Sequence, residues 1–293
     1  WMSGVIDDEA SLAGMTDVYD AAIEASLQWA IQHRINDIQI DEAPAAIAII
    51  GMGRYGGREV NFSSDADVII IYRPAEGADD DQANLFARKV QEDLRAILQG
   101  PTTFEPKIEL DMDLRPEGKN GPLVRSYASC EEYYRSWAST WEHQALLRAR
   151  YAAGDASLAE DFLMNIADPL RYPKIDLTET QIAEIRKLKA RMEAERLPRG
   201  VRRDRHLKLG KGGLSDVEWT IQLLQLQHAG DNANLRVNGT LQALNELEHR
   251  KLISAGDAVV LRKAWRMCTA ARNGSYLWSG RVNQADILPD DSY

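Results

Sequence analysis

The stretch that decides the fold is residues 51–72, which read GMGRYGGREVNFSSDADVIIIY. It joins a glycine-rich turn, two aspartates one residue apart and an apolar run. Successive side chains of an extended segment point to opposite faces, so Asp65 and Asp67 share a face. The apolar run 68–71 is typical of a strand inside a sheet. Two carboxylates that open a buried strand are costly to desolvate, and a cation between them would offset that cost.

Two other interpretations of this stretch are open. The aspartates could simply cap the entrance of a strand, as aspartates near turns often do. Alternatively, Gly51, Gly53 and Gly56 match the dinucleotide-binding pattern G-x-G-x-x-G after an expected strand at 46–50.

The residues after the glycines argue against a dinucleotide fold, which needs those glycines to open a long helix. Gly57, Asn61, Ser63 and Ser64 are poor helix formers, and the next strand begins almost at once. We therefore predict a tight strand-to-strand loop, whose exposed amides and serine hydroxyls hold a triphosphate beside the acids.

A third carboxylate is expected from residues 107–115, KIELDMDLR, in which apolar and polar residues alternate. The alternation predicts a strand over 107–114 with Glu109, Asp111, Asp113 and Arg115 on one face. A solvated edge strand would show the same pattern. Together with Asp65 and Asp67, this face offers the oxygen ligands that Mg2+ requires, with Asp111 the first candidate and Asp113 the second.

Hydrophobic periodicity predicts a strand-rich part followed by helices. The expected strands are 46–50, 66–72 and 107–114. The expected helices are 16–33, 81–98, 178–197, 215–229, 240–251 and 255–276. A further helix is expected to begin with Ser129 as its cap and to pack Tyr133, Tyr134, Trp137 and Trp141 into the core. Ser215 and Glu218 are expected to form a capping box.

Composition limits the classes of partner. The net charge of −10 disfavours extended binding to nucleic acid, and two cysteines cannot form a disulfide framework. No apolar stretch is long enough for a membrane span and no export signal is expected, which predicts a cytoplasmic protein. The segment 186–211 holds eleven Lys or Arg against three acidic residues. It is either a solvated helix end, a docking surface for an acidic partner or a clamp on the ATP phosphates.

Four separated stretches, in this order, resemble glutamine synthetase adenylyltransferase: 51–72, 109–124 (ELDMDLRPEGKNGPLV), 141–155 (WEHQALLRARYAAGD) and 208–229 (KLGKGGLSDVEWTIQLLQLQHA). The resemblance implies one catalytic half of a two-half enzyme. Its fold class would be α+β, a polymerase-beta-like nucleotidyltransferase domain with a small mixed sheet (1–165) followed by an all-α helical bundle (166–293).

The resemblance also implies residue roles. Asp65, Asp67 and Asp111 would bind two Mg2+ ions, with ATP as the substrate. Asp113 joins the catalytic set, although the family often has arginine there. The residues implied to bind the nucleotide are Gly53, Arg54, Gly56, Gly57, Ser63, Ser64 and Arg115.

The implied function is transfer of AMP from ATP to a tyrosine of glutamine synthetase, carried by the C-terminal, adenylylating half. Two alternatives remain: the half that removes AMP by phosphorolysis to give ADP, and a catalytically silent sensing or interaction module. Implied partners are glutamine synthetase and, for the full-length enzyme, a PII-type signalling protein with glutamine as an effector. Nucleic acid and membranes are not expected as partners.

Overall fold

The computed structural model describes residues 7–100 and 107–288, which form two compact units. The sheet unit comprises Ala13–Glu59 and Asp65–Leu170. The helical unit comprises Val60–Ser64, the residues before Ala13 and the chain from Arg171 onward. The predicted boundary between residues 165 and 166 stays a prediction.

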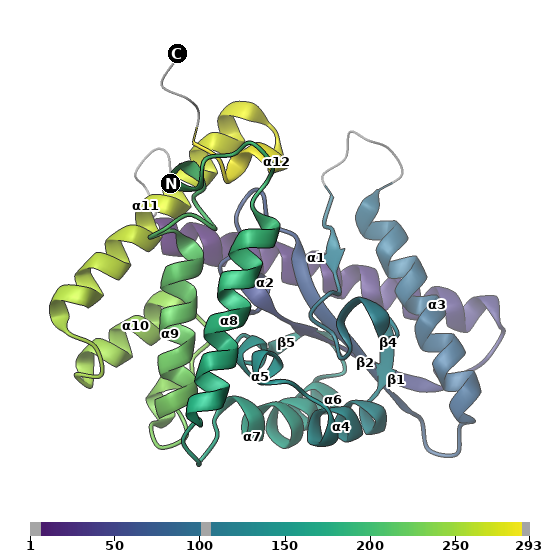
Figure 1. Cartoon of the computed structure of the whole chain (residues 1–293). Coiled ribbons are helices and arrows are strands. Elements are labelled where there is room, and N and C mark those ends of the chain that lie inside the picture. Colours follow the sequence, from purple (N-terminus) through teal and green to yellow (C-terminus); the bar gives the residue numbers. More distant parts are fainter. Residues whose placement is uncertain (1–6, 101–106, 289–293) are drawn as a thin grey trace. The chain divides into compact units, whose positions relative to one another are not determined.

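Within the described residues, five strands form one small mixed sheet (Figure 1). They are β1 (Ala45–Gly51), β2 (Ala66–Pro74), β3 (Leu110–Asp111), β4 (Val124–Ser126) and β5 (Arg150–Gly154). The order is β3-β2-β1-β5, with β4 also beside β2. β1 runs antiparallel to β2 and β5, whereas β3 and β4 run parallel to β2. A small mixed sheet followed by helices confirms the predicted α+β class.

The two central strands are apolar because both of their faces are buried. Ile50, Ile69 and Ile71 pack into one core cluster with Tyr134 and Phe162. Tyr134 lies in α4 (Tyr127–Ser136), and Phe162 begins the π-helical turn that follows α6 (Ala156–Asp161). The residues between them along each strand, such as Ile49 and Ile70, are equally buried on the opposite face. The helix α3 (Asp80–Gln99) contacts β1, β2 and β4.

The helix α3 (Asp80–Gln99) matches the prediction of 81–98 within two residues. The Asp79 side chain caps its start by accepting a hydrogen bond from the backbone N–H of Gln82. Gly100 ends it at φ 66°, a conformation that favours glycine. Its buried stripe includes Phe86, Val90 and Leu94. The acidic start, the periodicity and the glycine stop all point to the same helix.

The other helices of the sheet unit are α1 (Asp8–Asp37), α2 (Gly53–Gly56), α4 (Tyr127–Ser136), α5 (Thr140–Leu146), α6 (Ala156–Asp161) and α7 (Asp168–Arg171). The first residues of α1 and the last residue of α7 belong to the helical unit. α1 is much longer than the predicted 16–33.

The predicted helix with Ser129 as its cap and Trp137 in its core is wrong in both respects. Ser126 is the cap of α4, and its hydroxyl accepts from the Ser129 backbone N–H. α4 ends at Ser136, and a separate helix starts after the Ser139 capping box. Trp137, in the break between them, is 76% exposed.

The helical unit contains α8 (Glu179–Arg196), α9 (Leu214–His228), α10 (Thr240–His249), α11 (Ala255–Ser279) and α12 (Val282–Ala285). The first four lie close to their predicted ranges. The predicted capping box of Ser215 and Glu218 is wrong, because Gly213 precedes the helix and the Asp216 carboxylate instead accepts the Gly212 N–H. Every helix in the described part of the chain is too short or too polar to span a membrane.

The connection between β1 and β2 decides between the two interpretations of the glycines. α2 is a single helical turn, and the strands on either side of it are antiparallel. A dinucleotide fold requires parallel strands joined by a long helix, so the prediction of a strand-to-strand connection without such a helix is confirmed. The connection spans residues 52–65 and is longer than the predicted tight loop.

The strand predicted over 107–114 is wrong in length, because only Leu110 and Asp111 pair with β2. The Asp111 carboxylate accepts the Asp113 backbone N–H at 2.7 Å and the Arg115 N–H bonds the Met112 carbonyl. These bonds turn the chain immediately after β3, as aspartate side chains often do.

We expect the Asp79→Ala substitution to lower the free energy of unfolding by about 1 kcal/mol, because the Gln82 N–H loses its cap. Asp81→Ala, which removes an exposed acid from the same first turn, tests the charge alone and should cost about 0.5 kcal/mol. Urea denaturation measures both. Equal losses would mean that the cap contributes nothing beyond its charge.

Candidate functional site

Asp67 lies where β2 begins, directly against the turn that leaves β1. The Met52 N–H donates to the Asp67 carbonyl at 2.8 Å. Gly53 has φ +51°, and a Cβ on it would lie 2.0 Å from Asp67 Oδ2. The backbone of Gly53 therefore lies in contact with the carboxylate, and a side chain there would displace it.

Gly56 allows a second close approach, because a Cβ on it would lie 2.1 Å from the Arg148 carbonyl. Its N–H donates to Met52, and the N–H of Gly57 donates to Gly53. Both glycines are buried, so these two amides serve the turn itself. Arg54 lies partly buried in the same turn. The predicted nucleotide contacts of these residues stay predictions.

Asp111 is brought beside Asp67 by the sheet. The parallel register places Asp67 opposite Asp111, and the Ala66 N–H donates to the Glu109 carbonyl at 2.8 Å. Burial raises the pKa of the Asp111 carboxyl, the negative charges of Asp113 and Asp65 raise it further, and the hydrogen bond from the Asp113 amide lowers it. The charges of Asp65 and Asp111 thus act on one another.

These acids fit a hard divalent cation in chemistry and placement, since carboxylate oxygens are the ligands that Mg2+ prefers. In the described part of the chain, however, no three acidic, histidine or cysteine side chains gather closely enough to form a metal-binding group. Asp65, Asp67 and Asp111 are neighbours on paired segments without converging on one point. Their assignment as ligands stays a proposal.

Asp111 and Asp113 open onto a shallow depression of about 390 Å³. Lys119 Nζ lies 3.1 Å from Asp113 Oδ2, although the lysine side chain is 80% exposed. The other lining residues are Arg95, Glu109, Leu110, Met112, Arg115 and Leu123. The sequence did not single out Arg95 or Lys119, because a cation on a helix or in a turn carries no periodic signal.

Arg115 has a structural role. Its guanidinium donates to three backbone carbonyls, those of Met112, Lys119 and Gly121, at 2.7, 3.1 and 3.0 Å. The residue is 7% exposed. The guanidinium therefore holds the loop 112–121 together. The alternation of apolar and polar residues predicted Arg115 on a ligand-binding face, but the strand ends at Asp111.

Ser63 and Ser64 are engaged in a local turn. Both hydroxyls donate to Asn61 Oδ1, at 3.0 and 2.9 Å, and Ser64 Oγ accepts the Asn61 N–H. This segment belongs to the helical unit, whereas the aspartates belong to the sheet unit. The predicted phosphate contact of either serine remains a prediction.

Sequence reasoning missed a buried ion pair of the sheet unit. Arg148 and Glu59 are 6% and 7% exposed at their side chains and lie 3.5 Å apart. Glu59 also donates its N–H to Arg54, and Gly56 touches the Arg148 carbonyl. The pair thus holds the glycine turn in contact with the residues that precede β5. The sequence signal for this pair was that Arg148 lies in the stretch 141–155, one of the four that carry the family resemblance.

Several cations of the basic segment 186–211 form ion pairs within the helical unit. Lys189 contacts both Glu193 and Asp216, Arg203 contacts Glu193, and Arg202 contacts Asp204. These contacts favour a structural role for much of the segment.

Comparison with known proteins assigns the chain a family. The family described as glutamate-ammonia ligase adenylyltransferase matches residues 2–165, and the one described as PII-uridylyltransferase matches residues 184–292. Relatives named bifunctional glutamine synthetase adenylyltransferase/adenylyl-removing enzyme are 78% identical over the whole chain in Bifidobacterium longum (strain DJO10A), and 45% over 98% of it in Mycobacterium avium (strain 104). The chain spans 27% and 28% of their lengths.

We expect Gly53→Ala to lower the free energy of unfolding by about 2–4 kcal/mol, through backbone strain and the collision with Asp67. Gly77→Ala is the matched control, because Gly77 also has a positive φ but a Cβ on it would meet nothing within 4 Å. It should cost only about 1 kcal/mol. Equal losses in chemical denaturation would show that the Asp67 contact is unimportant.

Arg115→Ala should lower the free energy of unfolding by about 3 kcal/mol, because three carbonyls lose their donor. Lys119→Ala, in the same depression but exposed, should change it by less than about 0.5 kcal/mol. Thermal unfolding of both variants provides the measurement. A stable Arg115→Ala protein would contradict the structural role.

Proposed function

Since the chain belongs to the glutamate-ammonia ligase adenylyltransferase family, we propose that it catalyses Mg-dependent transfer of AMP from ATP to a tyrosine of glutamine synthetase. The observation that carries the proposal is the pairing of Asp67 with Asp111 across β2 and β3, with Gly53 packed behind Asp67. Carboxylates held side by side on a rigid sheet are suited to bind a cation and a polyphosphate together.

In the proposed mechanism, Asp65, Asp67 and Asp111 would hold the metal. Bound Mg2+ supplies positive charge that offsets the charge of the phosphates and lowers the pKa of an incoming hydroxyl. The sheet fixes Asp67, and the turn after β3 fixes Asp111 through the Asp113 amide. The site can therefore hold its carboxylates without reorganisation.

The transfer step joins the tyrosine oxygen to the α-phosphorus of ATP and breaks the bond from that phosphorus to the pyrophosphate oxygen. The hydroxyl proton passes to Asp111 or Asp113. Both carboxylates line the same depression, and Lys119 lies beside Asp113. AMP remains on the tyrosine and pyrophosphate leaves.

The runner-up function is removal of AMP from the tyrosine by phosphorolysis, which releases ADP. The relatives' name includes both activities, and the 27% of their length that the chain spans assigns neither to it. A silent sensing or interaction module is the third candidate, and the retained acids Asp65, Asp67 and Asp111 argue against it.

Regulation is part of the proposal for the full-length protein. The similarity of residues 184–292 to PII-uridylyltransferase supports a response to a PII-type signalling protein, with glutamine as a second effector. A cytoplasmic location is consistent with these partners. It stays a proposal.

The test incubates the chain with α-labelled ATP, Mg2+ and purified glutamine synthetase, beside a reaction that offers adenylylated synthetase and phosphate. Label on the synthetase supports the transferase, and release of ADP supports the runner-up. Activity in neither reaction favours the silent module.

Asp67→Asn should reduce the active reaction by about 1,000-fold or more, because one metal ligand loses its charge. Glu109→Gln is the matched control, since this acid lines the same depression and is not a proposed ligand. It should retain activity within about threefold, and chelation of Mg2+ should abolish activity in the parent protein. An active Asp67→Asn protein with an unchanged fold would sink the proposed site.

A further inference from the structure

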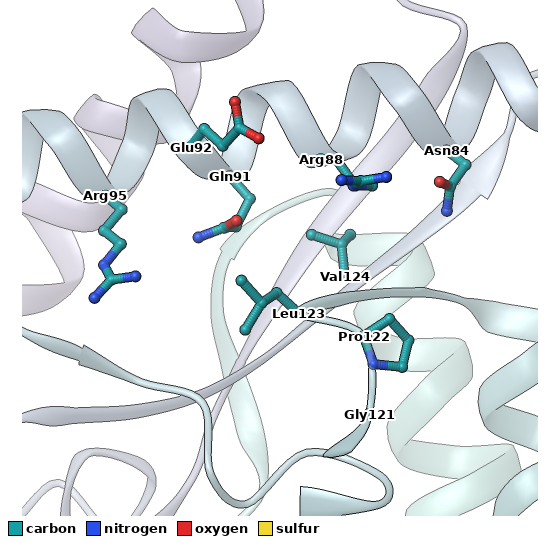
Figure 2. A pocket seen from close by; sticks show the side chains of 9 residues that line it. All are labelled: Asn84, Arg88, Gln91, Glu92, Arg95, Gly121, Pro122, Leu123 and Val124. Carbon is teal, nitrogen blue, oxygen red and sulfur yellow. The ribbon is translucent and has the colours of Figure 1, made fainter. Parts of the chain in front are cut away.

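A groove of about 510 Å³ lies between α3 and the chain that enters β4 (Figure 2). Its α3 wall consists of Asn84, Arg88, Gln91, Glu92 and Arg95, and its other wall is formed by Gly121, Pro122, Leu123 and Val124. All these residues belong to the sheet unit. None of them is among the proposed metal ligands or acids, so the groove requires its own explanation.

Gln91 places a polar amide on the α3 wall of the groove. The residue is 4% exposed, and its side chain extends from α3 on the side of Leu123 (Figure 2). An amide can both donate and accept hydrogen bonds, so this side chain suits an occupant with backbone polar groups.

Arg88 and Arg95 make the groove cationic in a chain whose net charge is −10. Over the described ranges 7–100 and 107–288, neither guanidinium has an ion-pair partner. Glu92 does not neutralise them fully, because its carboxylate lies 2.8 Å from the ammonium group of Lys89 and points to the opposite side of α3 from Gln91 (Figure 2). The groove therefore favours an anionic occupant.

The spacing of the arginines fits an extended occupant. Seven residues of helix separate them by about 10 Å along the axis of α3. Side chains on one face of an extended chain lie two or four residues apart, about 7 or 13 Å, and the long arginine side chains can adjust to either spacing.

The groove also leads toward the proposed transfer site. It shares Arg95 and Leu123 with the depression that contains Asp111 and Asp113. Leu123 is 40% exposed and offers an apolar contact beside the arginines. Within the described residues, β4 pairs only with β2, so its other edge can align an extended chain.

We propose that this groove binds an extended acidic segment of the protein acceptor and guides it toward Asp111. The proposal rests on the proposed function, since it concerns the acceptor of that reaction. Arg88 and Arg95 bind carboxylates of the segment, Gln91 hydrogen-bonds its backbone, and Leu123 contacts an apolar side chain. These residues are positioning residues that select the acceptor and take no part in the transfer step.

The test measures binding of purified, unmodified glutamine synthetase to the full chain without ATP, and separately binding of ATP with Mg2+. The variants are Arg88→Ala, Arg95→Ala and their double. Arg135→Ala is the matched control, because this exposed cation of the same unit does not line the groove. We expect the double variant to weaken synthetase binding about tenfold or more, with ATP binding and the Arg135→Ala protein unchanged.

Each outcome decides the proposal. Weakened ATP binding in the arginine variants would overturn it in favour of a nucleotide occupant, and unchanged synthetase binding, or none in the parent chain, would overturn it outright. If transfer activity is measured, the variants should raise the KM for the synthetase and leave kcat unchanged. Arginine-dependent synthetase binding without any transfer would refute the proposed function but retain the groove, so the two failures are distinguishable.

Discussion

The register of β2 is the constraint on which the candidate site depends. On one side β2 pairs antiparallel with β1, which brings the Gly53 turn against Asp67. On the other side it pairs parallel with β3, which places Asp111 opposite Asp67. A shift of one residue would turn every side chain of β2 to the other face and separate these groups. The backbone bonds from the Met52 N–H to the Asp67 carbonyl and from the Ala66 N–H to the Glu109 carbonyl hold this register, so the strand pairing fixes the site.

Much of the fold was predictable where several signals agreed. The helix α3 has an acidic cap, a regular apolar stripe and a terminal glycine, and its predicted range was nearly correct. The absence of a long helix after β1 was predictable because Gly57, Asn61 and the serines are poor helix formers. The pairing of Asp67 with Asp111 did not follow from alternation, which assigns faces within one strand and does not set which strands pair.

The failures come from side chains that bond to the backbone. Periodicity alone cannot show that the Asp111 carboxylate ends β3 by accepting an amide, or that Arg115 folds inward to three carbonyls. The split between α4 and α5 depends on Ser126 and Ser139. Short local hydrogen bonds of this kind compete with regular structure, and a pattern of apolar residues does not record the outcome.

The mixed sheet has a consequence for the order in which the chain folds. β1 and β2 are joined by residues 52–65, so their pairing closes a smaller loop than the pairing of β2 with β3 and brings Gly53 to Asp67 at a lower entropic cost. β3 follows α3 in the sequence. Its two residues can therefore pair with β2 only after a much longer loop has closed. We therefore expect the glycine turn to belong to the folding nucleus and Asp111 to arrive late, which φ-values from Ile49→Val and Leu110→Ala would measure. The carboxylates that repel one another are thus assembled last, on a sheet whose central strands are already formed.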